Sequence, residues 1–466
     1  MKNLFWTAVS KVLAIVTVTL IVVLVLMPSA WAADKYQVLR SFQAGSTDGE
    51  DPVGSLIFDD AGNLYGITVL GGSGGGCVRG QGCGTAFMLA PNGDGTWTES
   101  VIFNFPDYSQ GGASWPVAGL VRDGSGNLYG TLSIGGPNCY SHQSPHECGA
   151  VFELTPNGDG TWTEKVLHYF VGTDGSWPEA GLIFDTAGNL YGTTVWGGSG
   201  KCHDDGGDAG CGTVFKLTPK SDGSWKESVL HSFTGGRDGA YPIASVVVDT
   251  AGNLYGTTEY GGAGICPGRA VLPGCGTVFK LTPNPGGRWT ETVLHRFTGH
   301  NDGGWPLANL TLDAAGTLYG TASAGGTGHC HDYYNNKTGC GLVFSLALGS
   351  GGKWAEEVIH DFYGGGQEPA ASLIFDAAGS LYSTTSYGGG GGCYGLNGNK
   401  LGCGIVFKLV PEPRGTWTKH LLYAFTGGND GAGPNGSLIF DAAGGLYGAT
   451  GGGGTYGYGT VFEITP

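Results

Sequence analysis

The sequence predicts an all-β fold, a seven-bladed β-propeller with four antiparallel strands in each blade. Three observations lead to this prediction: a repeat of 62–65 residues, the strand and turn pattern inside each repeat, and the nature of the segments at the two ends of the chain. A period that extends along a whole chain indicates units that bury their apolar faces against one another. Seven units lie within the usual range of about four to eight propeller blades.

A Leu-Tyr pair followed by Gly or Ser marks every repeat. The seven pairs begin at Leu64, Leu128, Leu190, Leu254, Leu318, Leu381 and Leu446. In the third repeat, residues 181–184 and 190–194 flank a Gly-Asn turn, which is typical of a β-hairpin. Residues 211–219 and 225–233 are expected to add a third and a fourth strand. The mature chain shows no helical spacing of apolar residues, and four short antiparallel strands are typical of a propeller blade.

The two ends of the chain predict how the ring closes. The segment from Tyr36 to Phe42 matches a fourth strand, whereas the segment from Gly459 to Pro466 matches a third strand. The last repeat therefore lacks one strand, and the N-terminus has one to spare. Pairing the two removes exposed sheet edges, so we expect the N-terminal strand to complete the seventh blade.

Residues 1–32 are predicted to be a signal peptide. Lys2 and Lys11 supply a positive end, an apolar run covers residues 12–26, and Ala30-Trp-Ala32 fits a cleavage site between small residues. An uncleaved anchor is the alternative, but the run is shorter than the roughly 20 residues that span a bilayer. We expect residues 33–466 to form one propeller domain that is secreted or periplasmic, monomeric and free of the membrane after cleavage.

The charge of the chain excludes some partners. Removal of residues 1–32 takes away two lysines and no acid, which leaves 20 basic and 38 acidic residues and a net charge of −18. A field of that sign repels nucleic acids and anionic lipid surfaces, so we expect neither as a partner. The acidity also serves to keep an exported protein soluble.

The recurring segments GNLYG, GTVF and VLHSF resemble the GloVer tandem repeat of secreted bacterial proteins. The resemblance extends over residues 36–466 and departs from the pattern at Ser383 and in the last repeat. The DxxGNLY segment is also similar to the NHL-type propeller blade. The resemblance implies an exported repeat protein, and it implies no particular activity.

All twelve cysteines lie between the expected second and third strands. The pairs are Cys77/Cys83, Cys139/Cys148, Cys202/Cys211, Cys266/Cys275, Cys330/Cys340 and Cys393/Cys403. One pair per loop in an exported chain predicts six local disulfides. Metal binding is the rival interpretation, but two thiols per loop do not complete a four-ligand zinc site. The seventh repeat has no pair and only the short loop 451–459.

The loops between blades are the predicted location of function. Antiparallel order places these loops beside the disulfide loops, around one mouth of the central channel, and loops on a rigid scaffold often carry function. Flat apolar side chains and carboxylates in them predict a lectin-like site, in which rings stack on sugars and carboxylates accept hydrogen bonds from hydroxyls. The candidate ligand-binding residues are Trp115, Trp177, Tyr241, Trp305, Asp174, Asp238 and Asp302. The alternative is that each Trp packs over its following proline and each Asp-Gly forms a turn.

Features that recur in every repeat are expected to be structural. An aspartate opens each first turn, where its carboxylate can accept hydrogen bonds from backbone amides. These residues are Asp59, Asp123, Asp185, Asp249, Asp313, Asp376 and Asp441. Six tryptophans that begin the fourth strands are expected to pack, namely Trp97, Trp162, Trp225, Trp289, Trp354 and Trp417. His168, His231, His295 and His360 occupy one strand position and are expected to form part of an outer-strand surface.

Two unrepeated segments place imidazole beside carboxylate. They are Cys202-His-Asp-Asp205 and His329-Cys-His-Asp332. Each gives an incomplete ligand set, so the sequence predicts no metal site, no cofactor and no catalytic residue. No nucleophile elbow, phosphate-binding loop or HExxH motif is present.

The sequence thus predicts an exported propeller that acts as a binding or interaction module for extracellular glycan or protein. A polysaccharide-active lyase or hydrolase at the loop-rich mouth is the second interpretation, since catalytic residues of propeller enzymes need not form a linear motif. A structural cell-surface protein is the third.

Overall fold

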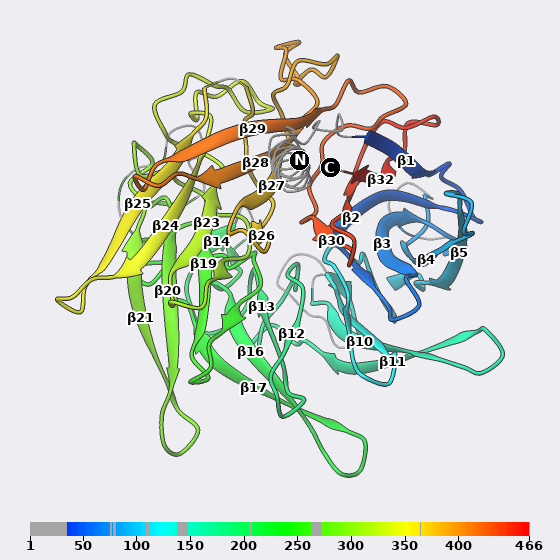
Figure 1. Cartoon of the computed structure of the whole chain (residues 1–466). Coiled ribbons are helices and arrows are strands. Elements are labelled where there is room, and N and C mark those ends of the chain that lie inside the picture. Colours follow the sequence, from blue (N-terminus) through cyan, green and yellow to red (C-terminus); the bar gives the residue numbers. More distant parts are fainter. Residues whose placement is uncertain are drawn as a thin grey trace, which may run out of the picture.

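The computed structural model describes residues 35–465 apart from 75–76, 78–80, 109–110, 138–147, 205–206, 263, 265, 267–271 and 364, and it omits the side chains of 203–208. Within these residues the strands form seven four-stranded antiparallel sheets, and no α-helix is present. Figure 1 shows the sheets arranged in a ring around a common centre. The predicted seven-bladed β-propeller is confirmed.

Blades 1 to 6 use strands that are consecutive or nearly consecutive in the chain, whereas blade 7 combines the last three strands with β1, and the fourth strand of a blade lies at the outer edge of the ring (Figure 1). Blade 1 contains β2 (Gly49–Phe58), β3 (Leu64–Gly71), β4 (Thr85–Pro91) and β5 (Trp97–Asn104). Blade 2 contains β7 (Val121–Arg122), β8 (Leu128–Leu132), β10 (Ala150–Pro156) and β11 (Trp162–Tyr169). Blade 3 contains β12 (Ile183–Phe184), β13 (Leu190–Thr194), β16 (Thr213–Pro219) and β17 (Trp225–Ser232). Blade 4 contains β18 (Val247–Val248), β19 (Leu254–Thr258), β20 (Thr277–Pro283) and β21 (Trp289–Arg296). Blade 5 contains β22 (Thr311–Leu312), β23 (Leu318–Ala322), β24 (Leu342–Leu348) and β25 (Trp354–Asp361). Blade 6 contains β26 (Ile374–Phe375), β27 (Leu381–Thr385), β28 (Ile405–Pro411) and β29 (Trp417–Ala424). Blade 7 contains β30 (Ile439–Phe440), β31 (Leu446–Thr450), β32 (Thr460–Thr465) and β1 (Lys35–Ser41). Two short pairs lie outside the blades: β6 (Ala113–Ser114) with β9 (Ile134–Gly135), and β14 (His203–Asp204) with β15 (Gly207–Asp208).

The ring closes through the N-terminal strand, as the ends of the sequence predict. Strand β1 pairs antiparallel with β32, from Lys35 opposite Thr465 to Ser41 opposite Thr460. Figure 1 shows the two strands side by side, blue against red. Because β1 covers the edge of β32, the last blade has no open edge at that strand.

Phenylalanine pairs join each blade to the next. One ring comes from the end of a fourth strand and the other from the third strand of the following blade, with ring centroids 5.0–5.3 Å apart and the rings edge to face. The pairs are Phe42–Phe87, Phe105–Phe152, Phe170–Phe215, Phe233–Phe279, Phe297–Phe344, Phe362–Phe407 and Phe425–Phe462. Edge-to-face pairs of buried rings add to the burial of apolar area, so these contacts hold the ring together. The six tryptophans of the fourth strands also pack, each within 6.5 Å of a tyrosine ring.

The glycine of the Leu-Tyr-Gly segment is required by this packing. A Cβ atom on Gly192 would lie 2.5 Å from Cζ of Phe215 and 3.0 Å from Cδ2 of Leu182, closer than side-chain atoms approach. Blade 6 has Ser383 at this position, and its hydroxyl donates a hydrogen bond to the carbonyl of Ala371 at 3.1 Å. That blade therefore already accommodates a Cβ.

We expect the substitution Gly192→Ala to destabilise the protein by about 1–3 kcal/mol, because the added methyl group overpacks the buried Phe215 ring. Ser383→Ala is the matched control, since it keeps the Cβ of a blade that already fits one and removes only one hydrogen bond. Thermal unfolding of both variants tests the prediction, and equal midpoints for Gly192→Ala and the parent protein would contradict it.

The aspartate that opens each first turn is structural, as predicted. In blade 3 the Asp185 carboxylate accepts hydrogen bonds from the backbone amides of Ala187 and Asn189, the Asn189 side chain and the Tyr191 hydroxyl at 2.7–3.0 Å. The other six aspartates each accept two backbone amides and a tyrosine hydroxyl in the same way. These hydrogen bonds favour the charged form, and they hold the pKa of Asp185 below its usual value despite partial burial.

Five of the six predicted disulfides are present. They join Cys77 to Cys83, Cys202 to Cys211, Cys266 to Cys275, Cys330 to Cys340 and Cys393 to Cys403. Cys139, the predicted partner of Cys148, lies outside the described residues. Five disulfides fit an extracellular or periplasmic location, where the environment is oxidising.

The predicted signal peptide, residues 1–32, is outside the description as well. In the part of the chain that is described, no helix has the length and apolar character needed to cross a membrane.

Candidate functional site

One residue in each blade precedes a proline and has a positive φ angle. These seven residues are Asp51 (59°), Trp115 (64°), Trp177 (59°), Tyr241 (57°), Trp305 (52°), Glu368 (53°) and Gly433 (61°), and we call them the mouth ring. The left-handed conformation is uncommon for residues other than glycine, and a following proline restricts the backbone further. Six strained non-glycine residues at equivalent positions therefore require strong local contacts, and strain of this kind is common at binding sites.

Backbone hydrogen bonds between blades hold the mouth ring. The amides of Trp177, Tyr241 and Trp305 donate to the carbonyls of the second cysteine in the preceding disulfide loop at 2.9–3.0 Å. In blade 1, which follows the short seventh loop, the Asp51 amide donates to the carbonyl of Tyr458 at 3.1 Å instead. These contacts confirm that the disulfide loops and the loops between blades share one face of the ring.

The four aromatic residues predicted to bind a ligand all belong to the mouth ring, on blades 2 to 5. Tyr241 and Trp305 are each 5% exposed and are part of the hydrophobic core. Trp115 and Trp177 are half-buried, and the Trp177 ring lies edge to face on Trp196 with centroids 4.4 Å apart. In blades 2 to 5, therefore, aromatic side chains fill the mouth ring.

The three predicted aspartates are placed differently. The carboxylate of Asp174 accepts a hydrogen bond from the Val171 amide at 2.9 Å and contacts His168 Nε2 at 2.9 Å. Asp238 and Asp302 likewise cap their own loops, through the amide and hydroxyl groups of Thr234 and Thr298 respectively. The structure therefore brings these carboxylates to histidines of the outer strands.

The mouth ring changes character on blades 6, 7 and 1, where it contains Glu368, Gly433 and Asp51. A cavity of about 600 Å³ opens here beside the short seventh loop, and we call it the cleft. Its lining residues are Glu50, Asp51, Leu70, Tyr333, Ser386, Tyr387, Ala432, Gly433, Asn435, Gly451, Gly452, Gly457 and Tyr458. A Cβ on Gly433 would meet no atom within 4 Å, so the space that tryptophan occupies in other blades is open in blade 7.

The cleft combines aromatic faces with hydrogen-bonding groups. Tyr333 is 39% exposed and Tyr458 is 38% exposed, so both rings are accessible to a ligand. Burial raises the pKa of Tyr387 to about 12, which keeps its hydroxyl protonated as a donor. The Ser386 hydroxyl donates to Oδ1 of Asn435 at 3.3 Å.

The charged groups that line the cleft are acidic. Burial, together with the neighbouring charge of Glu50, raises the pKa of Asp51 to about 6. A Cβ on Gly451 would lie 2.5 Å from Oδ1 of Asp51, so this glycine leaves room for the carboxylate. The cleft therefore carries negative potential near neutral pH and favours neutral or cationic ligands.

Sequence reasoning did not find the cleft, although one signal was present. Every repeat has a proline after the mouth-ring position. Four repeats have an aromatic residue before this proline, and the other three have Asp51, Glu368 and Gly433. The contribution of Tyr333 had no such signal, because it depends on contact between the disulfide loops of blades 5 and 6. There the amide of Leu396 donates to the Tyr333 carbonyl at 3.1 Å.

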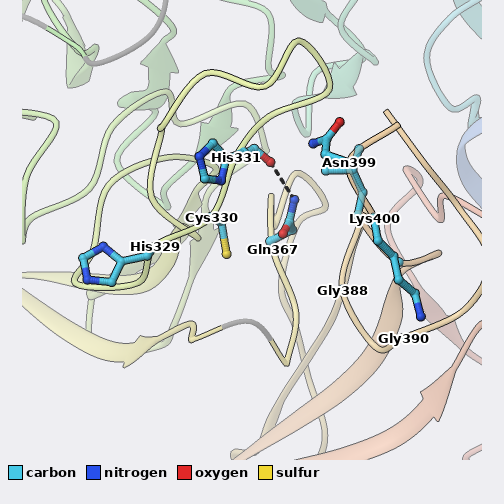
Figure 2. Close-up of a pocket in the computed structure, with 10 residues that line it drawn as sticks. His329, Cys330, His331, Gln367, Gly388, Gly390, Asn399 and Lys400 are labelled. Carbon is cyan, nitrogen blue, oxygen red and sulfur yellow. Dashed lines mark hydrogen bonds between the residues drawn. The ribbon is translucent and has the colours of Figure 1, made fainter. Parts of the chain in front are cut away.

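The segment from His329 to Asp332 borders a separate cavity of about 400 Å³ (Figure 2). The Asp332 carboxylate accepts hydrogen bonds from the amides of Tyr334 and Asn336 at 3.0 and 2.8 Å, and Cys330 is in a disulfide. Figure 2 shows the hydrogen bond from the Gln367 side chain to the His331 carbonyl, 3.0 Å long, and the two imidazole rings lying apart. The other His-Asp segment, at 202–205, has its histidine and aspartate side chains outside the described residues.

The central channel forms a third cavity, of about 540 Å³. Each blade lines it with the residue two positions after the mouth ring: Val53, Val117, Glu179, Ile243, Leu307, Ala370 and Asn435. Burial, with the neighbouring charge of Glu259, raises the pKa of Glu179 to about 7. Five of these seven residues are apolar, and Glu179 and Asn435 are the two polar ones.

A half-buried glutamate at the seam between blades 1 and 2 makes stability depend on pH. Burial raises the pKa of Glu164 from its usual 4.5 to about 7, and its Oε1 has no hydrogen-bond partner. Since the unfolded chain loses this proton at lower pH, the folded state is penalised increasingly as pH rises from 4.5 to 7.

We expect Glu164→Gln to raise stability at pH 8 by on the order of 2–3 kcal/mol and to change it little at pH 4.5. Thermal unfolding at the two pH values is the measurement. The exposed Glu412, as Glu412→Gln, is the control that should leave the difference between the two pH values unchanged. A Glu164→Gln variant with the parent's pH dependence would contradict the assignment.

The fold and the loop contacts define a class of protein: a disulfide-linked seven-bladed propeller with one asymmetric loop face. The Gloeobacter/Verrucomicrobia repeat matches residues 25–203 and 139–397, which together make up more than half of the chain. The chain belongs to the Gloeobacter/Verrucomicrobia repeat family, which confirms the resemblance drawn from the repeated segments.

Similarity to other proteins is weak. No curated protein matches the chain. A gluconolactonase from Xanthomonas campestris is 14% identical with a TM-score of 0.35, covering 68% of this chain and 78% of that protein. A Trichoderma reesei carbohydrate-active enzyme of family AA12, in its calcium structure, is 13% identical with a TM-score of 0.40, covering 94% and 96%. Similarity at this level says nothing about activity.

Proposed function

We propose that the protein is a glycan-binding module of the cell exterior, and that the cleft is its binding site. The observation that supports this most is the interruption of the mouth ring. Blades 2 to 5 fill the equivalent space with Trp or Tyr, whereas Gly433 and the short seventh loop leave it open. A feature that breaks the repeat is not needed to build a blade, so a function explains it better than packing does.

The chemistry of the cleft fits a neutral oligosaccharide. The accessible rings of Tyr333 and Tyr458 can stack on sugar faces, and Asn435, Ser386 and Asp51 offer donors and acceptors to hydroxyl groups. A volume of about 600 Å³ suits a few sugar rings. Uronate-rich polysaccharides are disfavoured, because their carboxylates would face Glu50 and Asp51.

Calorimetric titration of the purified protein with soluble neutral and uronate oligosaccharides tests this proposal. We expect saturable binding of a neutral oligosaccharide and at least tenfold weaker binding by Tyr458→Ala, which removes one stacking face. Tyr363→Ala, at a tyrosine that is 71% exposed and does not line the cleft, is the matched control. Binding that is equally strong in parent and Tyr458→Ala protein would place the ligand elsewhere.

Polysaccharide cleavage is the second candidate, and the state of Asp51 favours it. A carboxyl group with a pKa of about 6 beside the second carboxyl group of Glu50 is suited to donate a proton near neutral pH. Release of reducing or unsaturated sugars that falls as pH rises above 6, and that disappears in Asp51→Asn, would favour this candidate. Binding without turnover would favour the module.

A further inference from the structure

The seams between blades carry a repeated set of polar residues on the outer strands, separate from the cleft. Three positions meet at a seam: one on the fourth strand of a blade, one in the loop that follows it, and one on the fourth strand of the next blade. Between blades 2 and 3 these are His168, Asp174 and Glu227, whose ligand atoms all lie within 4.8 Å of one another. One imidazole and two carboxylates thus converge.

The next two seams carry the same three residue types in a more open arrangement, in which the three ligand atoms are not all within 4.8 Å of one another. His231 Nε2 lies 3.8 Å from Asp238 Oδ2, and His295 Nε2 lies 3.5 Å from Asp302 Oδ2. The third members are Glu291 and Glu356. The charges of the neighbouring His-Asp pairs influence the pKa of each of these carboxyl groups, which burial raises. Several buried atoms of these sets have no hydrogen-bond partner, namely Glu227 Oε1, His231 Nε2, Glu291 Oε1, His295 Nε2 and Glu356 Oε1.

The seam closed by β1 shows what such a set requires. Here Arg40 takes the place of the histidine, and its Nη2 lies 2.6 Å from Asp48 Oδ2 and 2.7 Å from Glu99 Oε2. A permanent cation therefore sits between the two carboxylates. At the three histidine seams the carboxylates face an imidazole in place of the guanidinium.

The seam between blades 5 and 6 lacks the two carboxylates and has a lysine in their place. His360 is present on β25, but the loop position is Gly365 and the next strand carries Lys419. The Lys419 ammonium group donates to the Gly365 carbonyl at 3.4 Å. The seam with the lysine therefore has neither the loop aspartate nor the strand glutamate. The closing seam, which has both carboxylates, has Arg40 between them.

We propose that the seams between blades 2 and 3, 3 and 4, and 4 and 5 each bind a divalent first-row transition-metal ion through the His, Asp and Glu side chains. Imidazole nitrogen with carboxylate oxygens is a ligand set suited to Zn²⁺, with water completing the coordination. The His168 and Asp174 side chains remain 21% and 17% exposed, which gives the ion a path from solvent. Each ion takes the place that the Arg40 guanidinium has at the closing seam and joins two blades.

Titration of metal-free protein with Zn²⁺ at pH 7, followed by calorimetry, tests the proposal. We expect about three ions per chain and a higher unfolding temperature in Zn²⁺. His168→Gln, His231→Gln and His295→Gln should each remove about one ion or weaken one site about 100-fold. His360→Gln changes the same strand position at a seam that lacks the loop aspartate and the strand glutamate, so it is the control and should retain all ions.

Two results would overturn the proposal. Undiminished Zn²⁺ binding in the triple histidine variant would place the ions elsewhere, for example at His329 and His331. An absence of Zn²⁺ binding, with the same unfolding temperature in the presence and absence of Zn²⁺, would show that the seams hold no metal ion.

Discussion

A chain that begins at Phe42, without β1, is expected to lose its stable fold. Strand β1 covers the edge of β32, and the rings of Tyr36 and Tyr423 stack 3.9 Å apart. Tyr36 and Leu39 also pack against buried core residues, so the loss is on the order of 5 kcal/mol at roughly 1.5–3 kcal/mol per large side chain, together with the β1–β32 hydrogen bonds. The exposed edge of β32 is in addition a template for aggregation.

Circular dichroism and thermal unfolding of purified protein measure this effect. The control is a chain that begins at Lys35, which keeps β1 and should unfold at the temperature of the parent protein. A synthetic peptide of residues 35–41 should restore part of the stability to the truncated chain. Equal unfolding temperatures with and without β1 would show that the ring does not depend on this strand.

Gly433→Trp is expected to abolish glycan binding without unfolding the protein. The φ angle of Gly433 is 61°, within the range of 52–64° at which the mouth ring already holds three tryptophans. The new side chain would extend into the open space that defines the cleft. We expect at least a tenfold loss of affinity for a neutral oligosaccharide, because the aromatic ring takes the volume of the ligand.

Gly433→Ala is the matched control for this experiment. It imposes the same left-handed backbone on a residue with a Cβ but adds little volume, and that Cβ meets no atom within 4 Å. Its affinity should stay within about threefold of the parent protein, as expected for a change that adds no large group to the site. If the alanine and tryptophan variants lose binding equally, backbone strain rather than occlusion is responsible, and the cleft loses its support as the binding site.

The fold could be predicted from the sequence because every blade uses the same contacts. The Leu-Tyr pair, the first-turn aspartate and the terminal phenylalanine each satisfy one local requirement, so they recur and mark the strands. Ring closure followed from the same logic, since the segment from Tyr36 to Phe42 matches a fourth strand. The structure confirms these elements one by one.

The candidate site was less predictable, because it depends on where the repeat fails. The aromatic residues Trp115, Trp177, Tyr241 and Trp305 occupy one repeated position and pack in the scaffold, and a ligand-binding role for them stays a prediction. The informative residues were Asp51, Glu368 and Gly433, the three members of the mouth ring that are not aromatic. The seam sets were hidden for another reason: His168 meets Glu227 only through packing between two blades, which spacing along the chain does not reveal.

Hydrogen–deuterium exchange with and without a bound neutral oligosaccharide shows which part of the loop face contacts the ligand. We expect protection of residues 50–51, 386–387, 432–435 and 451–458, which surround the cleft, with little change near Trp177 or Trp305. Protection confined to the loop face of blades 2 to 5, or to the outer strands, would contradict the claim that the interrupted mouth ring forms the binding site.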